Sequence, residues 1–381
     1  SSPLTFCHLT GYDAKTGLQN ALRDDLVQSA LHRGPLADLA GGGPVGNDVE
    51  LTIVTDAQRA ARRGLRRRAG AAVAIDPRTG EILVLASGPT YDPLEIKATD
   101  RAFTLFNTDP DSPGLNRALR GVYPPGSIFK LIVGAAAIEG GTVSVDREHV
   151  CTGSIWVDGR EMGCWKRTGH GKLDMEGAVA NSCNVYFAHL GIDLGTERMS
   201  EFASESGIFA APNLVLWAQE SQVGTDDVGE RASANYAIGQ GKLAVTPLAA
   251  ARLAGAISQE GRLVDPWLVK AVLDPDGRVL RHGEPGSTRQ AIRPSTAGIL
   301  AGMMELAVES GTADEAAIPR VKVAGKTGSA ENPSGAAHAW CVGFAPADDP
   351  RVAVAVIVEH GGSGGAVAAP IARDIIEELL K

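Results

Sequence analysis

The sequence has no apolar run long enough to cross a lipid bilayer and no excess of basic residues. A membrane-spanning helix needs about 20 apolar residues, whereas the longest apolar runs here, residues 131–138 and 352–358, suit buried segments of a helix or a strand. The 45 acidic and 36 basic side chains give a net charge of −9, which argues against general nucleic-acid binding. We therefore expect a globular chain with no nucleic-acid partner.

Glycine and proline, in contrast, are abundant. The 46 glycines and 21 prolines predict many turns and argue against a helical bundle, while 44% apolar residues are enough for a large core. Residues 1–48 are irregular, with a possible helix at 17–31 and a glycine-rich linker at 41–44. We place a domain boundary there, so that residues 49–381 form the main domain.

Within that domain, strand patterns lie near both ends and helical patterns lie between them. A hairpin is predicted from strands 71–75 and 81–87, which are joined by a turn. The other expected strands are 49–54, 321–324, 329–330, 339–345 and 351–358, and the expected helices are 56–68, 130–139, 175–190, 247–258 and 371–380. This order predicts an α+β fold in which distant strands meet in one sheet.

The first candidate for chemistry is the segment YPPGSIFK at residues 123–130, which precedes an apolar helix. Ser127 is expected in the first helical turn, and Lys130 follows three residues later on the same face. A lysine whose pKa is lowered by burial or by another cation can act as the base for such a serine. The helix N-terminus favours the negative charge that develops when the serine attacks a carbonyl. Alone, this spacing is also typical of a capping serine and a surface lysine.

Two further motifs follow in order. Ser182 and Asn184 form Ser-x-Asn where a helix opens or is interrupted, and Lys326, Thr327 and Gly328 form Lys-Thr-Gly on a predicted strand that continues to Ser329. Ser-x-x-Lys, Ser-x-Asn and Lys-Thr-Gly are together the signature set of serine β-lactamases and penicillin-binding proteins.

The flanking sequence resembles the transpeptidase domain of class B penicillin-binding proteins from about Val49 to the C-terminus. The matching segments are residues 76–83, 91–93, 116–118, 123–127, 238–241, 246–248 and 311–313. The resemblance implies an antiparallel sheet flanked by helices, with an all-helical subregion. It also implies a membrane helix and a pedestal before the catalytic domain, so that residues 1–48 would be a linker or the remnant of the pedestal.

The resemblance implies acyl transfer on the D-Ala-D-Ala end of peptidoglycan stem peptides, with Ser127 as the nucleophile and Lys130 as its base. Ser182 would relay a proton to the leaving amine, and Asn184 would hold Lys130 and the substrate amide. Lys326 would attract the substrate carboxylate and keep Lys130 neutral. Thr327, Gly328 and Ser329 would bind substrate, and the backbone N–H groups of Ser127 and Ser329 would form the oxyanion hole. β-Lactams would acylate the same serine.

The family likeness also implies partners and a location. The enzyme would act at the extracytoplasmic face of the bacterial cytoplasmic membrane, cross-linking glycan strands made by a SEDS-type polymerase. A D,D-carboxypeptidase or a β-lactamase shares the same motifs, and a penicillin-sensing receptor domain would use acylation as a signal. No Glu-x-x-Leu-Asn motif lies between Asn184 and Lys326, which argues against a class A β-lactamase.

The five cysteines are an odd number, so complete disulfide pairing is impossible. Cys151, Cys164, His170 and Cys183 have the composition of a closed tetrahedral zinc site. The alternatives are a disulfide between Cys151 and Cys164, or free buried thiols. The resemblance adds that elongation-type class B enzymes, the penicillin-binding protein 2 group, can carry a metal site just before and within the Ser-x-Asn motif. A metal there would brace that loop and would not be required for catalysis.

Overall fold

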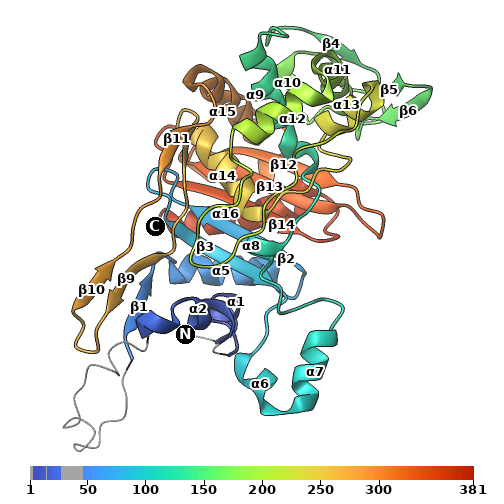
Figure 1. The fold of residues 1–381 in the computed structure, drawn as a ribbon. Coiled ribbons are helices and arrows are strands. Elements are labelled where there is room, and N and C mark those ends of the chain that lie inside the picture. Colours follow the sequence, from blue (N-terminus) through green and yellow to red (C-terminus); the bar gives the residue numbers. More distant parts are fainter. Residues whose placement is uncertain (1–2, 14, 27–45) are drawn as a thin grey trace, which may run out of the picture.

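The computed structural model describes residues 3–13, 15–26 and 46–381. Its central feature is an antiparallel sheet of five strands in the order β12-β13-β14-β2-β3 (Figure 1). The strands are β2 (Gly70–Ile75), β3 (Ile82–Gly88), β12 (Ala324–Ala330), β13 (His338–Ala345) and β14 (Val352–Val358). The predicted α+β class and the hairpin of β2 and β3 are confirmed.

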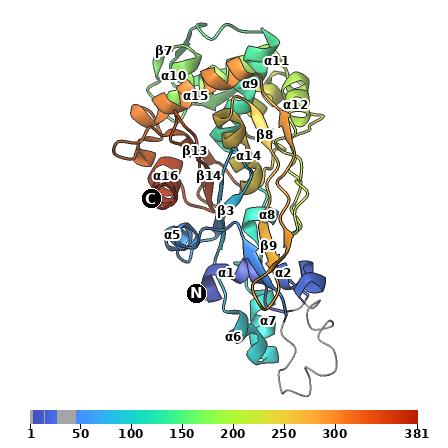
Figure 2. The same cartoon turned by 90° about the vertical axis from the view of Figure 1, so that its left-hand side faces the viewer.

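Both faces of this sheet are covered. Helices α5 (Thr55–Leu65) and α16 (Ala369–Leu379) pack on one face, and α14 (Pro247–Ser258) packs on the other (Figure 2). Alternation along the strands supplies both cores, since Ala72 and Ala74 of β2 join the layer of α5 and α16 while Ala71 and Val73 join the layer of α14.

A helical region lies beside β12, the edge strand. It contains a 3₁₀ turn η1 (Gly126–Phe129) and the helices α9 (Lys130–Gly140), α10 (Met175–Ala180), α11 (Asn184–Leu194), α12 (Thr196–Glu205), α13 (Glu230–Ala237) and α15 (Pro294–Glu309). Two small two-stranded sheets extend from it, β4 (His149–Cys151) with β7 (Gly171–Leu173) and the hairpin of β5 (Ser154–Val157) with β6 (Arg160–Gly163).

The remaining elements surround this frame. They are α1 (Pro3–Thr10), α2 (Gly17–Ala21), α6 (Pro93–Ala98), α7 (Asp100–Thr108), α8 (Arg117–Arg120), β1 (Asp48–Leu51), β8 (Arg262–Val264), β9 (Val269–Leu273), β10 (Val279–His282), β11 (Thr288–Gln290), η2 (Asp314–Ala316) and the π-helix η3 (Gly364–Ala368). Among the described residues, no helix combines the length and apolar character needed to span a membrane.

Two expectations are refined in detail. The helix expected over 175–190 is divided into α10 and α11 at the Ser-x-Asn motif, where the motif predicted that a helix opens or is interrupted. The strand predicted to carry Lys-Thr-Gly and to continue to Ser329 is confirmed as β12, but of the separate strand expected at 321–324 only Ala324 belongs to it. The linker expected at 41–44, and the end of the helix expected at 17–31, lie outside the described residues, and the domain boundary near residue 48 stays a prediction.

Candidate active site

The turn that carries Ser127 is held by a close backbone contact with a neighbouring loop. The N–H of Gly126 donates to the carbonyl of Gly239 at 3.0 Å. Both glycines have positive φ, +54° and +76°, and a Cβ on Gly239 would lie 1.9 Å from the carbonyl oxygen of Gly126. Only glycine permits this approach and this backbone conformation at residue 239, which explains locally why the Ile238–Gly241 segment contains glycine.

A buried ion pair holds the chain just before the same turn. Arg117 contacts Glu359 at 2.6 Å, and the hydroxyl of Tyr123 donates to the same carboxylate oxygen at 2.8 Å. The indole N–H of Trp340 donates to the carbonyl of Pro124 at 3.0 Å. The nucleophile turn is thus anchored to β13 and to the end of β14.

Lys130 lies just after the turn and is fully buried, with 0% exposure. Its Nζ donates to the carbonyl of Ser182 and to Oδ1 of Asn184, both at 2.8 Å. Burial lowers its pKa to about 8. Two N–H bonds are used in these contacts, so a neutral amine here retains a lone pair that can accept a proton.

The Ser-x-Asn motif forms the turn between α10 and α11. Ser182 has φ +53°, a left-handed conformation that is uncommon for a residue other than glycine. This turn directs the Ser182 carbonyl to Lys130, while Asn184 begins α11 and directs its side chain to the same amine. The break between α10 and α11 therefore brings both motif residues into contact with Lys130.

Strand β12 forms the opposite wall. Alternation buries Lys326 completely and leaves Thr327 and Ser329 on the other face of the strand. Thr327 donates to the hydroxyl of Thr312 at 2.8 Å. Burial, and then the nearby Lys130, lower the pKa of Lys326 well below the usual lysine value. A Cβ on Gly328 would lie 3.2 Å from the carbonyl oxygen of Pro125, so glycine keeps β12 close to the nucleophile turn.

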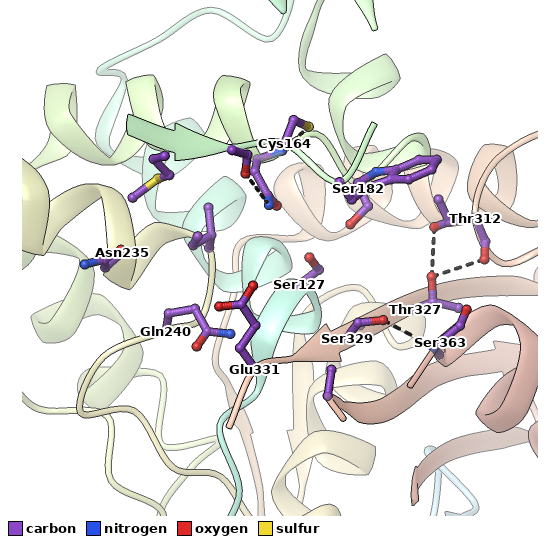
Figure 3. Close-up of a pocket in the computed structure, with 18 of the residues that line it drawn as sticks. Ser127, Cys164, Ser182, Asn235, Gln240, Thr312, Thr327, Ser329, Glu331 and Ser363 are labelled. Atoms are coloured by element: carbon purple, nitrogen blue, oxygen red, sulfur yellow. Dashed lines mark hydrogen bonds between the residues drawn. The ribbon is translucent and has the colours of Figure 1, made fainter. Parts of the chain in front are cut away.

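These elements enclose a cleft of about 930 Å³ (Figure 3). Of the catalytic and substrate-binding residues predicted from the sequence, six line it: Ser127, Ser182, Asn184, Thr327, Gly328 and Ser329. Cys164 of the predicted metal site lines it as well. Lys130 and Lys326 lie behind its walls. In the part of the chain that the structure describes, the Ser127 hydroxyl has no hydrogen-bond partner, although it faces the cleft.

The cleft also contains polar residues to which sequence reasoning assigned no role. Five of them are Asn235, Gln240, Thr312, Glu331 and Ser363. Gln240 and Thr312 lie in segments that carried the family resemblance, and Glu331 follows Ser329 by two residues, just past the end of β12. Their closeness in sequence to the recognised motifs could have pointed to Gln240, Thr312 and Glu331. No sequence pattern pointed to Asn235 or Ser363.

Behind the Ser-x-Asn turn lies the predicted cluster of three cysteines and one histidine. The ligand atoms of Cys151, Cys164, His170 and Cys183 all lie within 4.8 Å of one another, and all five cysteines of the chain are free and buried. The disulfide expected as the alternative is therefore absent from the structure.

The hydrogen bonds of this cluster join it to the Ser-x-Asn turn. The N–H of Asn184 donates to Sγ of Cys164 at 3.4 Å, and the N–H of Tyr186 donates to Sγ of Cys183 at 3.5 Å. A hydrogen bond from Cys183 lowers the pKa of Cys164 and so favours a thiolate there. Nε2 of His170 is buried without a hydrogen-bond partner in the structure. This donor set fits a tetrahedral metal ion.

Comparisons with known proteins agree on one family. Residues 70–377 match the model of the penicillin-binding protein transpeptidase domain. The chain is 35% identical to the peptidoglycan D,D-transpeptidase PbpA of Mycolicibacterium smegmatis, over 100% of this chain and 82% of that protein. It is 29% identical to the peptidoglycan D,D-transpeptidase MrdA of Acinetobacter baumannii, over 97% of this chain and 61% of that protein.

A solved structure extends this likeness to the fold. Penicillin-binding protein A from M. tuberculosis, determined as a ceftriaxone acyl-enzyme complex, superimposes with a TM-score of 0.91 at 32% identity. The match covers 100% of this chain and 92% of that one. The arrangement of sheet, helices and cleft described above is therefore shared by a protein that forms a covalent acyl-enzyme.

Proposed function

The chain belongs to the family of penicillin-binding protein transpeptidase domains, and from this premise we propose that it is a peptidoglycan D,D-transpeptidase that uses Ser127 as its nucleophile. The observation that carries the proposal is the convergence of the three motifs on one cleft. Ser127, Ser182 and Thr327 line it, and Lys130 joins the first motif to the second by two hydrogen bonds.

In the first half-reaction, Oγ of Ser127 attacks the carbonyl carbon of the penultimate D-Ala. The hydroxyl proton passes to the lone pair of Lys130, whose two N–H bonds stay with Ser182 and Asn184. The backbone N–H groups of Ser127 and Ser329 stabilise the negative oxygen. When the peptide C–N bond breaks, the leaving amine takes a proton through the Ser182 hydroxyl, and D-Ala departs.

In the second half-reaction, an amine of a neighbouring stem peptide attacks the acyl-enzyme. The new amide bond forms as the ester bond to Ser127 breaks, and the amine proton returns to the serine oxygen through the same groups. A β-lactam enters the same first step, but its leaving amine stays attached to the acyl group. The ester therefore persists and blocks the site.

Substrate orientation follows from the chemistry of β12. The hydroxyl groups of Thr327 and Thr312 suit the terminal carboxylate. Because β12 is an edge strand, its free backbone groups can pair with an extended peptide that lies in the cleft. A side chain at residue 328 would contact the nucleophile turn and push β12 away from it. Gly328 therefore keeps β12, and a peptide paired with it, near Ser127.

We also propose that Cys151, Cys164, His170 and Cys183 hold a structural zinc ion. The proposal is supported by the 4.8 Å clustering of their ligand atoms and by the unpaired Nε2 of His170. A bound zinc ion would supply charge and rigid cross-linking and no reaction chemistry. Through the N–H groups that donate to Cys164 and Cys183, it would fix the Ser-x-Asn turn.

For the biological setting we propose cell-wall elongation at the outer face of the cytoplasmic membrane, with a SEDS-type polymerase supplying the glycan strands. The support is the likeness to PbpA and MrdA, which are named peptidoglycan D,D-transpeptidases and whose substrate lies outside the cytoplasm. Co-purification of the protein with a SEDS-type polymerase from solubilised membranes tests the partner, and recovery of the protein without the polymerase would contradict it.

The first test is intact-protein mass spectrometry after incubation with benzylpenicillin. We expect one stable adduct per chain and none in Ser127→Ala. An adduct that forms and vanishes while penicilloate accumulates would identify a β-lactamase instead. A stable adduct without turnover of stem peptides would favour a sensor, and release of D-Ala without cross-linking in the presence of an acceptor amine would favour a carboxypeptidase.

A further inference from the structure

We propose that Glu331 selects donor stem peptides by binding an ammonium group on the side chain of their third residue, the one that precedes D-Ala-D-Ala. The inference rests on the proposed function and concerns the donor half of the same cleft. The proposal gives a role to Glu331, a charged residue that lines the cleft just past the end of β12.

The first observation is the row of side chains along the edge strand. Residues two apart in a strand share a face, so Thr327 and Ser329 of β12 both face the cleft, and Glu331, one residue past the end of the strand, lines the cleft as well. Figure 3 shows the hydroxyl groups of Thr312, Thr327 and Ser363 on one side of Ser127, and the carboxylate of Glu331 on the other side beside Gln240. The cleft thus has an end suited to an anion and an end suited to a cation.

The second observation is the direction of the donor peptide. In the proposed binding mode its terminal carboxylate would lie at Thr327 and its scissile carbonyl between Ser127 and the N–H of Ser329, so these two points define the path. An extended chain advances about 3.3 Å per residue, which places the third residue roughly 5 Å beyond the scissile carbonyl. Glu331 follows Ser329 by two residues and lies on the side of Ser127 away from Thr327 (Figure 3), so the third residue would lie beside its carboxylate.

The third observation is the charge itself. The carboxylate of Glu331 is exposed to the cleft and has no ion pair or hydrogen bond with any other described residue. Where donor and acceptor stem peptides share one sequence, the donor also carries the amine-bearing residue. An ammonium is the group that complements an unpaired carboxylate at this end of the cleft.

Other charged side chains line the cleft on the side of β6 and α13, across from β12. Glu161, Arg167 and Arg231 line the cleft there, and Arg231 donates to the carbonyl of Arg160. Glu161 is the second exposed carboxylate of the cleft and lies on β6, away from the line of β12. It is therefore the matched control for a general effect of negative charge.

The experiment compares three donors, Nα-acetylated X-D-Ala-D-thiolactate thioesters in which X is lysine, Nε-acetyl-lysine or norleucine. The readout is kcat/KM for thiolactate release by the full chain, expressed as the ratio of the lysine donor to the norleucine donor. We expect a wild-type ratio of about two to five, the size typical of one exposed ion pair. Nε-acetyl-lysine should behave like norleucine, and added salt should reduce the ratio.

In Glu331→Gln the ratio should fall to about one, in Glu331→Lys it should fall below one, and in Glu161→Gln it should keep the wild-type value. A wild-type ratio near one, or a ratio unchanged in Glu331→Gln, overturns the inference. Benzylpenicillin adduct formation by each variant shows that it is folded. If neither the thioesters nor benzylpenicillin acylate the wild type, the proposed function fails as well. If all three donors acylate the protein without a preference for the charged one, only this inference is overturned and the proposed function stands.

Discussion

The turn that carries Ser127 and the turn that carries Ser182 face the same cleft but are held by different chemistry. The first is anchored by the Arg117–Glu359 ion pair and by backbone contacts such as Gly126 with Gly239. The second is backed by sulfur and imidazole groups, with Cys183 placed between the two residues that face the cleft. The contacts that hold the first turn are made between protein groups alone, whereas the groups behind the second turn form a donor set that suits a metal ion.

This difference teaches how the two turns depend on their surroundings. The first should be insensitive to metal supply and to redox conditions, because it depends on groups with fixed charge and on backbone geometry. The second should depend on both. Lys130 links the two turns, since it begins the helix after the first and donates two hydrogen bonds to the second.

The largest expected effect is therefore that of Lys130→Ala, which removes the link and the proposed base together. We expect acylation by benzylpenicillin to slow by about 10²- to 10⁴-fold, because general-base assistance is lost. The rate is followed by quenched samples and intact mass. Lys242→Ala, which changes an exposed lysine paired with Asp226 and Asp227, is the control. A rate close to wild type would remove Lys130 as the base.

Next in size is Arg117→Ala, which tests the anchor of the first turn. The Arg117 side chain is 4% exposed, and its loss leaves Glu359, 20% exposed, without its partner. Breaking such a buried pair costs about 3 kcal/mol, which urea unfolding can measure. Metal content should stay the same. If Arg117→Ala also released the metal, the two anchors would not be independent.

Removal of the metal tests the second turn. Protein purified without added metal should contain about one zinc ion per chain. A chelator should lower the melting temperature and slow acylation by about ten- to a hundredfold, with recovery when zinc is returned.

Cys164→Ala should abolish metal binding, whereas Cys341→Ala, a buried cysteine of β13, should keep it. Absence of metal together with a mass lower by two hydrogens would show that a disulfide forms instead.

The smallest effect is a pH dependence of acylation. Lys130 must be neutral to accept a proton, and its pKa is lowered by burial to about 8. The protonated form dominates below that value, so the rate should rise as pH increases through 8 and then level off. From pH 9 to pH 7 we expect a loss of about tenfold. A flat profile over this interval would mean that Lys130 titrates elsewhere or is not the base.

Sequence patterns predicted the parts of the fold that local apolar spacing controls. The helix expected at 247–258 matches α14 residue for residue, and the hairpin of β2 and β3 lies where its turn chemistry placed it. The order of the central sheet could not be derived, because the pairing of β14 with β2 joins segments from opposite ends of the chain. Local pattern contains no information about such pairing.

The course of the chain at the second and third motifs depends on tertiary contacts that oppose local preference. Residues 325–329 have low strand propensity, yet they form part of β12 because β13 pairs along their whole length. The helical pattern of 175–190 breaks at Ser182, where the left-handed backbone places the carbonyl against Lys130. The composition of the metal-like cluster was readable from the sequence, but its closeness in space was not, since it requires the β4–β7 pairing and the Cys183 turn to meet.

The edge position of β12 has one more consequence. A strand with a free side is a template for pairing with any extended chain, including the same strand of a second molecule, and such pairing begins aggregation. In this fold the free side of β12 faces the cleft, and the charged residue Glu331 directly follows the end of the strand. A single extended peptide can enter the cleft and pair with β12, whereas the edge strand of a second molecule cannot. The free backbone groups of β12 are therefore available to the substrate and not to aggregation.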